Sequence, residues 1–96
     1  MNPEAQKAYD DALVQIQKCL EQKSDTLSLY GRNLTKIPPE IGKLTHIRGL
    51  RVGGNKLTNL PPEIGNLQRL TFLYAHHNEL RSLPPEIGKL LSLIHI

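Results

Sequence analysis

The sequence predicts an α/β solenoid, a right-handed superhelix with short parallel strands on its concave face and a capping helix at its N-terminus. The first observation is the segment Leu-Pro-Pro-Glu-Ile-Gly-Asn-Leu at residues 60–67, which has near-copies 23 residues earlier, at 37–44, and 23 residues later, at 83–90. Self-similarity at a fixed period of this length indicates stacked repeat units. The second observation is that the residues before the first repeat follow a helical period instead.

Each repeat unit places its apolar residues and one asparagine in fixed slots. In two consecutive units these slots hold Ile47, Leu50, Val52, Asn55, Leu57 and Leu60, and then Leu70, Leu73, Ala75, Asn78, Leu80 and Leu83. This spacing is the L-x-x-L-x-L-x-x-N-x-L pattern of a leucine-rich repeat. We therefore assign residues 24–90 to about three such repeats.

Three short strands are expected where apolar residues alternate, at 27–29, 50–52 and 73–75. Because alternate side chains of a strand point to opposite faces, parallel pairing should stack the inward residues in columns. The Pro-Pro-Glu-Ile-Gly segment cannot form a second long strand, since proline lacks the N–H that a ladder requires. We expect a tight turn there, which places Ile41, Ile64 and Ile87 in the core.

The asparagine slot has a structural role in this interpretation. Asn55 and Asn78 should use both ends of their amides to satisfy backbone groups that the bend after each strand leaves unpaired. Arg32 occupies this slot in the first unit. We interpret it as a mark of the atypical terminal repeat that solenoids require.

Residues 1–23 are expected to form the N-terminal capping helix. Asn2 is suited to the N-cap, Pro3 to the first helical position and Glu4 to the first turn, where the helix dipole favours an acid. One apolar stripe follows at helical spacing: Ala5, Ala8, Tyr9, Ala12, Leu13, Ile16, Cys19 and Leu20. This stripe should cover the open side of the first repeat. The alternative is a helix that binds a partner or a membrane surface, and its acidic polar face argues against an anionic membrane.

The last six residues, 91–96, do not fit the repeat. Leu-Ser-Leu-Ile-His-Ile reads like the translation of the inverted end of a common sequencing-library transposon adaptor. We hypothesise that this tail is an assembly artefact that mimics the start of a fourth repeat, and that the true product continues beyond Leu90.

Composition and charge restrict the function classes. The chain has 96 residues, enough for one domain or part of one, with no stretch that resembles a signal peptide or a membrane span. A single cysteine cannot form an internal disulfide, so we expect a cytoplasmic protein. Residues 24–96 carry nine basic and five acidic residues, a net charge of +4. These charges lie mostly in variable slots rather than in a stripe, which favours a solvated surface over a nucleic-acid-binding site.

The outward residues of the strands are the candidate site. Parallel pairing puts them in rows across the concave face, and three of the four aromatic residues fall in these slots. The predicted partner-binding residues are Ser28, Tyr30, Arg51, Phe72, Tyr74, His76 and His77. Phe72 lies in an outward slot, so packing in the core does not require it to be apolar, and it is a candidate contact residue. We expect Gly49 beside it to leave room for a ligand side chain.

Enzyme chemistry is not expected, and no catalytic, cofactor-binding or metal site is assigned. Gly42-Lys43 and Gly88-Lys89 resemble the end of a phosphate-binding loop, but Ile37 and Leu83 replace its first glycine and leucines replace its hydroxyl residue. The histidines and Cys19 match no metal-ligand spacing. Cys19 lies in the apolar stripe and is expected to be a core residue.

Residues 24–90 resemble the 23-residue repeats of intracellular leucine-rich repeat proteins, the LPPEIGNLxxL type of Roco GTPases, plant intracellular Ras-group proteins and scribble- or erbin-like scaffolds. The N-terminal helix with the segment Leu-Ser-Leu-Tyr-Gly-Arg-Asn-Leu-Thr at 27–35 is similar to the start of bacterial, Roco-like members. This resemblance implies a leucine-rich repeat solenoid that recognises a protein on its concave face. It also implies a partner such as a small GTPase, or a GTPase domain further along the same chain.

The function predicted from the sequence is therefore a non-catalytic protein-interaction module. Three alternatives remain open. They are a regulatory region of a larger Roco-type GTPase, a small stand-alone ligand binder, and weak nucleic-acid binding through the scattered basic residues.

Overall fold

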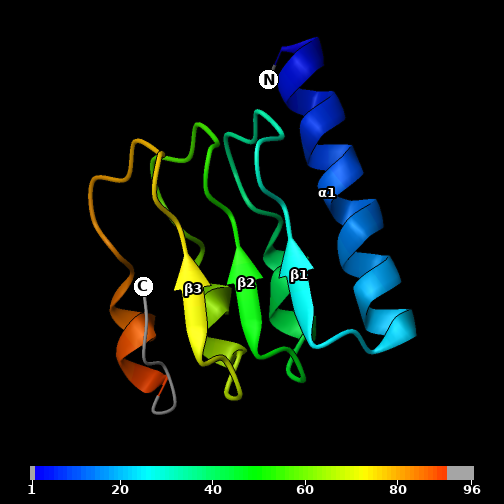
Figure 1. The fold of residues 1–96 in the computed structure, drawn as a ribbon. Coiled ribbons are helices and arrows are strands. Elements are labelled where there is room, and N and C mark those ends of the chain that lie inside the picture. Colours follow the sequence, from blue (N-terminus) through cyan, green and yellow to red (C-terminus); the bar gives the residue numbers. More distant parts are fainter. Residues whose placement is uncertain (1, 91–96) are drawn as a thin grey trace.

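The computed structural model describes residues 2–90, and the adaptor-like tail predicted at 91–96 lies outside the described residues. The chain begins with helix α1 (Pro3–Gln22) and continues through three short strands, β1 (Thr26–Ser28), β2 (Gly49–Arg51) and β3 (Phe72–Tyr74). Each strand is followed by a 3-10 helix of five residues: η1 (Pro39–Lys43), η2 (Pro62–Asn66) and η3 (Pro85–Lys89). Figure 1 shows the strands side by side, with α1 beyond β1.

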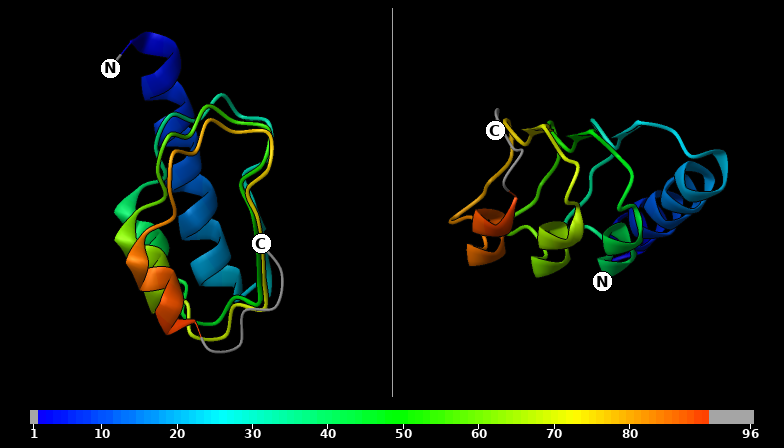
Figure 2. Two further views of the ribbon diagram at one scale, coloured as in Figure 1. Left: turned by 90° about the vertical axis from the view of Figure 1, so that its left-hand side faces the viewer. Right: turned by 90° about the horizontal axis from the view of Figure 1, so that it is seen from below.

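The three strands form one parallel sheet in the order β1-β2-β3. Leu27 pairs with Leu50 and Leu50 with Leu73, so the units stack in register at the predicted period. Seen along the stacking direction, the turns superpose, with the strands on one side and the 3-10 helices on the other (Figure 2). The predicted solenoid of parallel strands is therefore confirmed.

The strands begin one residue earlier than predicted. Each prediction started at the first inward leucine, such as Leu27, whereas the ladder already includes the residue before it. Hydrogen bonds also continue past the strand ends, because Leu29 N–H donates to the Arg51 carbonyl at 2.7 Å and Val52 N–H to the Tyr74 carbonyl at 2.8 Å. The extended ribbon is thus longer than the strands themselves.

A continuous aliphatic core fills the space between the strands and the 3-10 helices. Its largest fully buried side chains are Leu29, Leu34, Ile41, Leu44, Ile47, Leu50, Val52, Leu57, Ile64, Leu67, Leu70 and Leu73. Burying such a side chain contributes about 1.5–3 kcal/mol. The columns predicted from the repeat slots are therefore the main source of stability.

The Pro-Pro-Glu-Ile-Gly segment forms the predicted tight turn. In each unit a proline begins the 3-10 helix, where its missing N–H costs no hydrogen bond. Gly65 allows η2 and η3 to pack closely, because a Cβ on this residue would lie 2.8 Å from the Cβ of Glu86 and 3.0 Å from its carbonyl oxygen. The glycine of the motif is thus a packing residue between units.

Helix α1 packs on the first unit. The Asn2 side chain accepts a hydrogen bond from Ala5 N–H at 2.7 Å, which confirms the predicted N-cap. The buried face of the helix is Ala5, Ala8, Ala12, Ile16 and Cys19, and the helix contacts β1 and η1. Among residues 2–90, no helix is both long and apolar enough to cross a membrane.

The asparagine slot works as predicted. Asn55 is buried, and its carbonyl oxygen accepts hydrogen bonds from Arg32 N–H at 2.8 Å and Leu34 N–H at 3.1 Å. Its amide donates to the carbonyls of Leu29 at 2.8 Å and Val52 at 2.9 Å. One side chain therefore ties the bends of two successive units together.

Candidate functional site

The outward residues of the sheet form three rows across the strand face, the surface that is expected from the sequence to be concave. Pairing aligns Thr26 with Gly49 and Phe72, and Ser28 with Arg51 and Tyr74. The third row continues at the same period past the strand ends and holds Tyr30, Gly53 and His76. Six of the seven predicted contact residues therefore lie in these rows.

His77 is the seventh predicted contact residue. It follows His76 in a left-handed backbone conformation, with a φ of 58°. Its exposed ring stays next to that of His76, with 5.1 Å between the ring centroids. It thus lies at the end of the third row.

Aromatic rings run along β3 and beyond its end. The centroids of Phe72 and Tyr74 are 5.3 Å apart, and those of Tyr74 and His76 are 6.1 Å apart in an edge-to-face arrangement. Such distances lie in the range of favourable aromatic pairs. The rings pack against one another and line one edge of the strand face.

The expectation that Gly49 leaves room for a ligand side chain is wrong. A Cβ placed on Gly49 would collide with the ring of Phe72, which already fills the space above this glycine. Phe72 is accordingly half-buried. Its ring can pack across β2 because Gly49, its neighbour in the row, has no side chain.

The second glycine of the face lies below a real hollow. A depression of about 240 Å³ is lined by Tyr30, Arg51, Gly53, Tyr74 and His76, and we call it the tyrosine hollow. In its row Gly53 lies between Tyr30 and His76. A Cβ on Gly53 would lie 3.5 Å from the Tyr30 ring, at ordinary contact distance, whereas the Phe72 ring overlaps the corresponding position of Gly49. The hollow therefore results from a glycine flanked by bulky neighbours.

Tyr30 forms one wall of the tyrosine hollow. Its ring lies against the following unit, because a Cβ on Gly54 would lie 3.1 Å from the Tyr30 Cζ atom. Gly54 has a φ of +67°, which favours glycine independently of this contact. The Tyr30 side chain is nevertheless 59% exposed, so one side of it faces solvent.

Arg51 provides the charge of the tyrosine hollow. Its guanidinium carbon lies 5.6 Å from the centroid of the Tyr74 ring, which is cation–π distance. Among residues 2–90 the one ion pair joins Lys7 and Asp11 on α1, so Arg51 is paired with no carboxylate in this part of the chain. A positive charge with aromatic surroundings thus faces outward.

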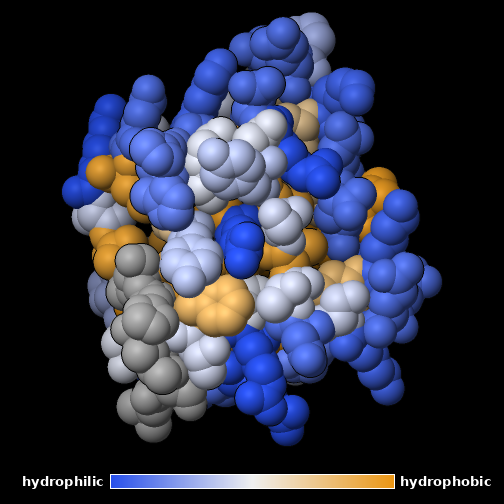
Figure 3. Space-filling view, in the orientation of Figure 1, coloured by the Kyte–Doolittle hydropathy of each residue, from blue (hydrophilic) through white to orange (hydrophobic). Residues whose placement is uncertain are grey.

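Most of the strand face is polar or of intermediate hydropathy, and its apolar surface is divided into small patches (Figure 3). No group of three or more metal-ligating side chains occurs within the described residues. The face offers chemistry for non-covalent recognition, by ring contact and by charge.

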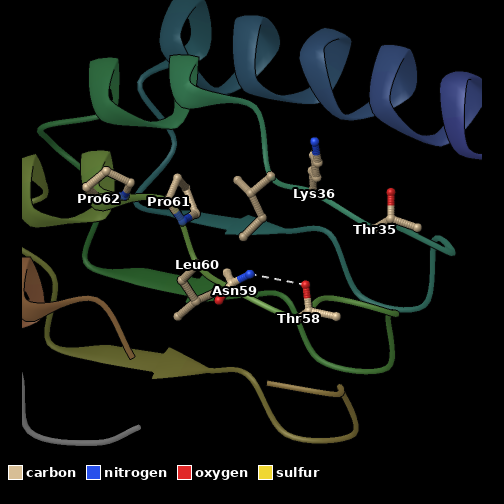
Figure 4. A pocket seen from close by; sticks show the side chains of 8 residues that line it. Thr35, Lys36, Thr58, Asn59, Leu60, Pro61 and Pro62 are labelled. Atoms are coloured by element: carbon tan, nitrogen blue, oxygen red, sulfur yellow. Dashed lines mark hydrogen bonds between the residues drawn. The ribbon is translucent and has the colours of Figure 1, made fainter. Parts of the chain in front are cut away.

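A second depression lies between the returning segments of the first two units, away from the aromatic rows. It has a volume of about 270 Å³, and its lining residues are Thr35, Lys36, Ile37, Thr58, Asn59, Leu60, Pro61 and Pro62. In Figure 4 the Asn59 amide points to the Thr58 hydroxyl, at 3.2 Å. This groove holds no aromatic ring, and it is slightly larger than the tyrosine hollow.

Cys19 behaves as the core residue that its position in the apolar stripe predicted. It is buried on the inner face of α1, with its Sγ atom 3.6 Å from the Ser24 carbonyl and 4.0 Å from His46 Nε2. Burial raises the pKa of the Cys19 thiol, which disfavours the reactive thiolate. The proximity of His46, 27 positions later in the sequence, had no signal in the sequence spacing.

The chain was compared with protein families and with known proteins. Residues 10–96 match the family described as leucine-rich repeat region. None of the curated proteins is significantly similar in sequence. A solved leucine-rich repeat protein of Leptospira interrogans is 25% identical with a TM-score of 0.43, and the match covers 83% of this chain and 33% of that one.

A second solved structure, YopM from Yersinia enterocolitica, is 22% identical with a TM-score of 0.36, and the match covers 91% of this chain and 27% of YopM. The chain therefore spans a third or less of these two proteins. The family match covers most of the sequence and agrees with the repeat slots and the stacked parallel strands. The chain belongs to the leucine-rich repeat family, whose members are typically non-enzymatic protein-interaction modules.

Proposed function

We propose that the chain binds a partner protein on its strand face and that the tyrosine hollow is the centre of this contact. The observation that carries the proposal is the combination of two tyrosine rings and an arginine around one depression. Tyrosine and arginine are enriched among the residues that dominate binding energy at protein interfaces. The aromatic pairs along β3 hold part of this surface in place before a partner arrives, which lowers the entropy cost of binding.

The tightly packed Phe72 has a supporting role in this proposal. Its ring lies on Gly49 and against Tyr74. It therefore orients Tyr74 and contributes apolar surface at the edge of the contact. Ser28 provides a hydroxyl in the same row as Arg51, while His76 and His77 extend the contact beyond the strand ends.

The proposed compartment is the cytoplasm, where a single free thiol such as that of Cys19 stays reduced. From the family resemblance we also propose that the partner is a GTPase, or that a GTPase domain follows the repeats in the same protein. A full-length reading frame that encodes a nucleotide-binding motif downstream of these repeats would support the proposal of a GTPase domain.

Site-specific photo-crosslinking in the native cell tests the proposal. A photoreactive phenylalanine analogue is placed at Tyr74 on the strand face or, as a control, at the exposed Lys43 at the end of η1 on the opposite side. We expect one discrete crosslinked protein from position 74 and none from position 43, and the purified partner should then bind the purified chain directly. Crosslinking from position 43 alone would contradict a partner on the strand face.

A further inference from the structure

We propose that the tyrosine hollow is a subsite for a carboxylate side chain, so that the partner presents an aspartate or a glutamate there from an acidic segment. This inference rests on the proposed function and specifies the chemistry of the partner. It starts from the lining of the hollow, which contains an arginine and no acidic residue.

The backbone at the floor of the hollow is already occupied. The Gly53 carbonyl accepts a hydrogen bond from Gly31 N–H at 3.1 Å and another from the Asn55 amide at 3.2 Å, and Gly54 N–H donates to the His76 carbonyl at 3.1 Å. An occupant must therefore be recognised mainly by the side chains of the walls. Those side chains are two tyrosines, an arginine and a histidine.

Arg51 has unused hydrogen-bonding capacity. A guanidinium carries five N–H donors in a planar fork, and no side-chain hydrogen bond of Arg51 occurs within residues 2–90. The Tyr74 ring lies against the guanidinium at 5.6 Å and limits the directions that it can take. A carboxylate fits this group best, because its two oxygens can accept two parallel N–H donors.

The size and the surroundings favour one acidic side chain over a nucleic-acid backbone. A depression of about 240 Å³ holds a side chain and its immediate neighbours. The paired strand residues form two of the three rows. These rows are Thr26, Gly49 and Phe72, and Ser28, Arg51 and Tyr74, so Arg51 is the single cation in them. Tracking a phosphate backbone requires a stripe of basic residues. The isolated Arg51 suits a single carboxylate.

The charge of the repeats supports an acidic partner. Residues 24–90 contain nine Lys and Arg and five Asp and Glu, which gives a net charge of +4. Such an excess steers an acidic segment towards the repeats and is screened by salt. Arg51 then fixes one carboxylate of that segment in the tyrosine hollow.

Peptide selection with the purified 96-residue chain tests the inference. A display library of random extended peptides is selected on the chain, on Arg51→Gln and on Arg48→Gln. Arg48 is exposed and precedes β2, so it provides the same change of charge outside the hollow. Circular dichroism confirms that all three proteins are folded.

We expect peptides enriched in Asp and Glu on the chain and on the Arg48 variant, and no such enrichment on the Arg51 variant. Replacing the acid of a selected peptide by its amide should weaken binding by roughly tenfold, the scale of a charge-assisted hydrogen bond. Selected peptides without an acidic excess, or an excess that survives in the Arg51 variant, would overturn the inference. Failure to select any acidic peptide, or preferential binding of a single-stranded oligonucleotide that depends on Arg51, would overturn it as well.

The same peptides separate this inference from the proposed function. Peptides that lack acids but lose binding to Tyr30→Ala and Tyr74→Ala would remove the carboxylate subsite and leave the strand face as the interface. Peptides that bind these two variants as well as they bind the chain would contradict the strand-face interface itself.

Discussion

At the scale of single residues, the most constrained positions are polar. Asn55 is the one buried polar side chain among the described residues, and its hydrogen bonds satisfy the bend after the strand in two units. This role could be predicted from the sequence, because an asparagine that recurs among buried leucines must have hydrogen-bond partners for its amide. Asn78 repeats it, since its carbonyl accepts from Leu57 N–H at 2.9 Å and its amide donates to the Val52 carbonyl at 2.9 Å.

Asn55→Ala should lower the free energy of unfolding by about 3 kcal/mol, because it leaves several buried backbone groups without partners. Asn59→Ala is the matched control, since Asn59 is exposed and bonds only to the Thr58 hydroxyl among the described residues. Its effect should stay within about 0.5 kcal/mol. Urea denaturation followed by circular dichroism measures both. Equal effects would mean that Asn55 does not tie the units together.

The residue scale also shows where the sequence could not predict the candidate site. Period alone aligns Gly49 with Phe72 and Gly53 with His76, so the rows could be predicted. Whether an aromatic ring packs over a given glycine depends on the rotamers of the neighbouring side chains. Phe72 covers Gly49, whereas Tyr30 stands beside Gly53 and leaves the hollow open. Rotamers of exposed aromatic residues have no periodic signal in the sequence.

At the scale of elements, local pattern predicted the structure well. The N-cap at Asn2 and the apolar stripe gave α1, and the proline-glycine motif gave the tight turns. The strand starts were displaced by one residue, because the pattern marks inward side chains while pairing depends on the backbone. Pairing extends to the residues on either side of the inward leucine.

The close packing of successive 3-10 helices gives a test at this scale. Gly65→Ala should destabilise the chain by about 2 kcal/mol, the usual cost of overpacking, because its Cβ would press on Glu86. Gly88→Ala changes the same position of the next unit, where nothing lies within 4 Å of the new Cβ in the described structure. It should be neutral to within about 0.5 kcal/mol. Thermal unfolding of the two variants compares them. A Gly88 variant that loses as much stability as the Gly65 variant would refute close packing as the reason for the glycine.

At the scale of the whole molecule, each element within residues 2–90 contacts only its neighbours along the stack. β1 packs on β2, β2 on β3, η1 on η2 and η2 on η3, while α1 touches β1 and η1. Stability in such an arrangement is approximately a sum of unit and nearest-neighbour terms. Stacking also places outward side chains from three units on one face. The tyrosine hollow exists only because Tyr30, Arg51 and Tyr74 come from different units.

The most direct test of the account is amide chemical-shift mapping with isotopically labelled chain and the partner, or a selected peptide, added stepwise. We predict that the largest shifts occur at residues 28–30, 51–54 and 72–77, which surround the tyrosine hollow. The amides of η1 and η2, on the opposite side of the solenoid, should change little (Figure 2). Shifts concentrated in those 3-10 helices, with the strand face unchanged, would contradict the central claim that the stacked strands form the binding surface.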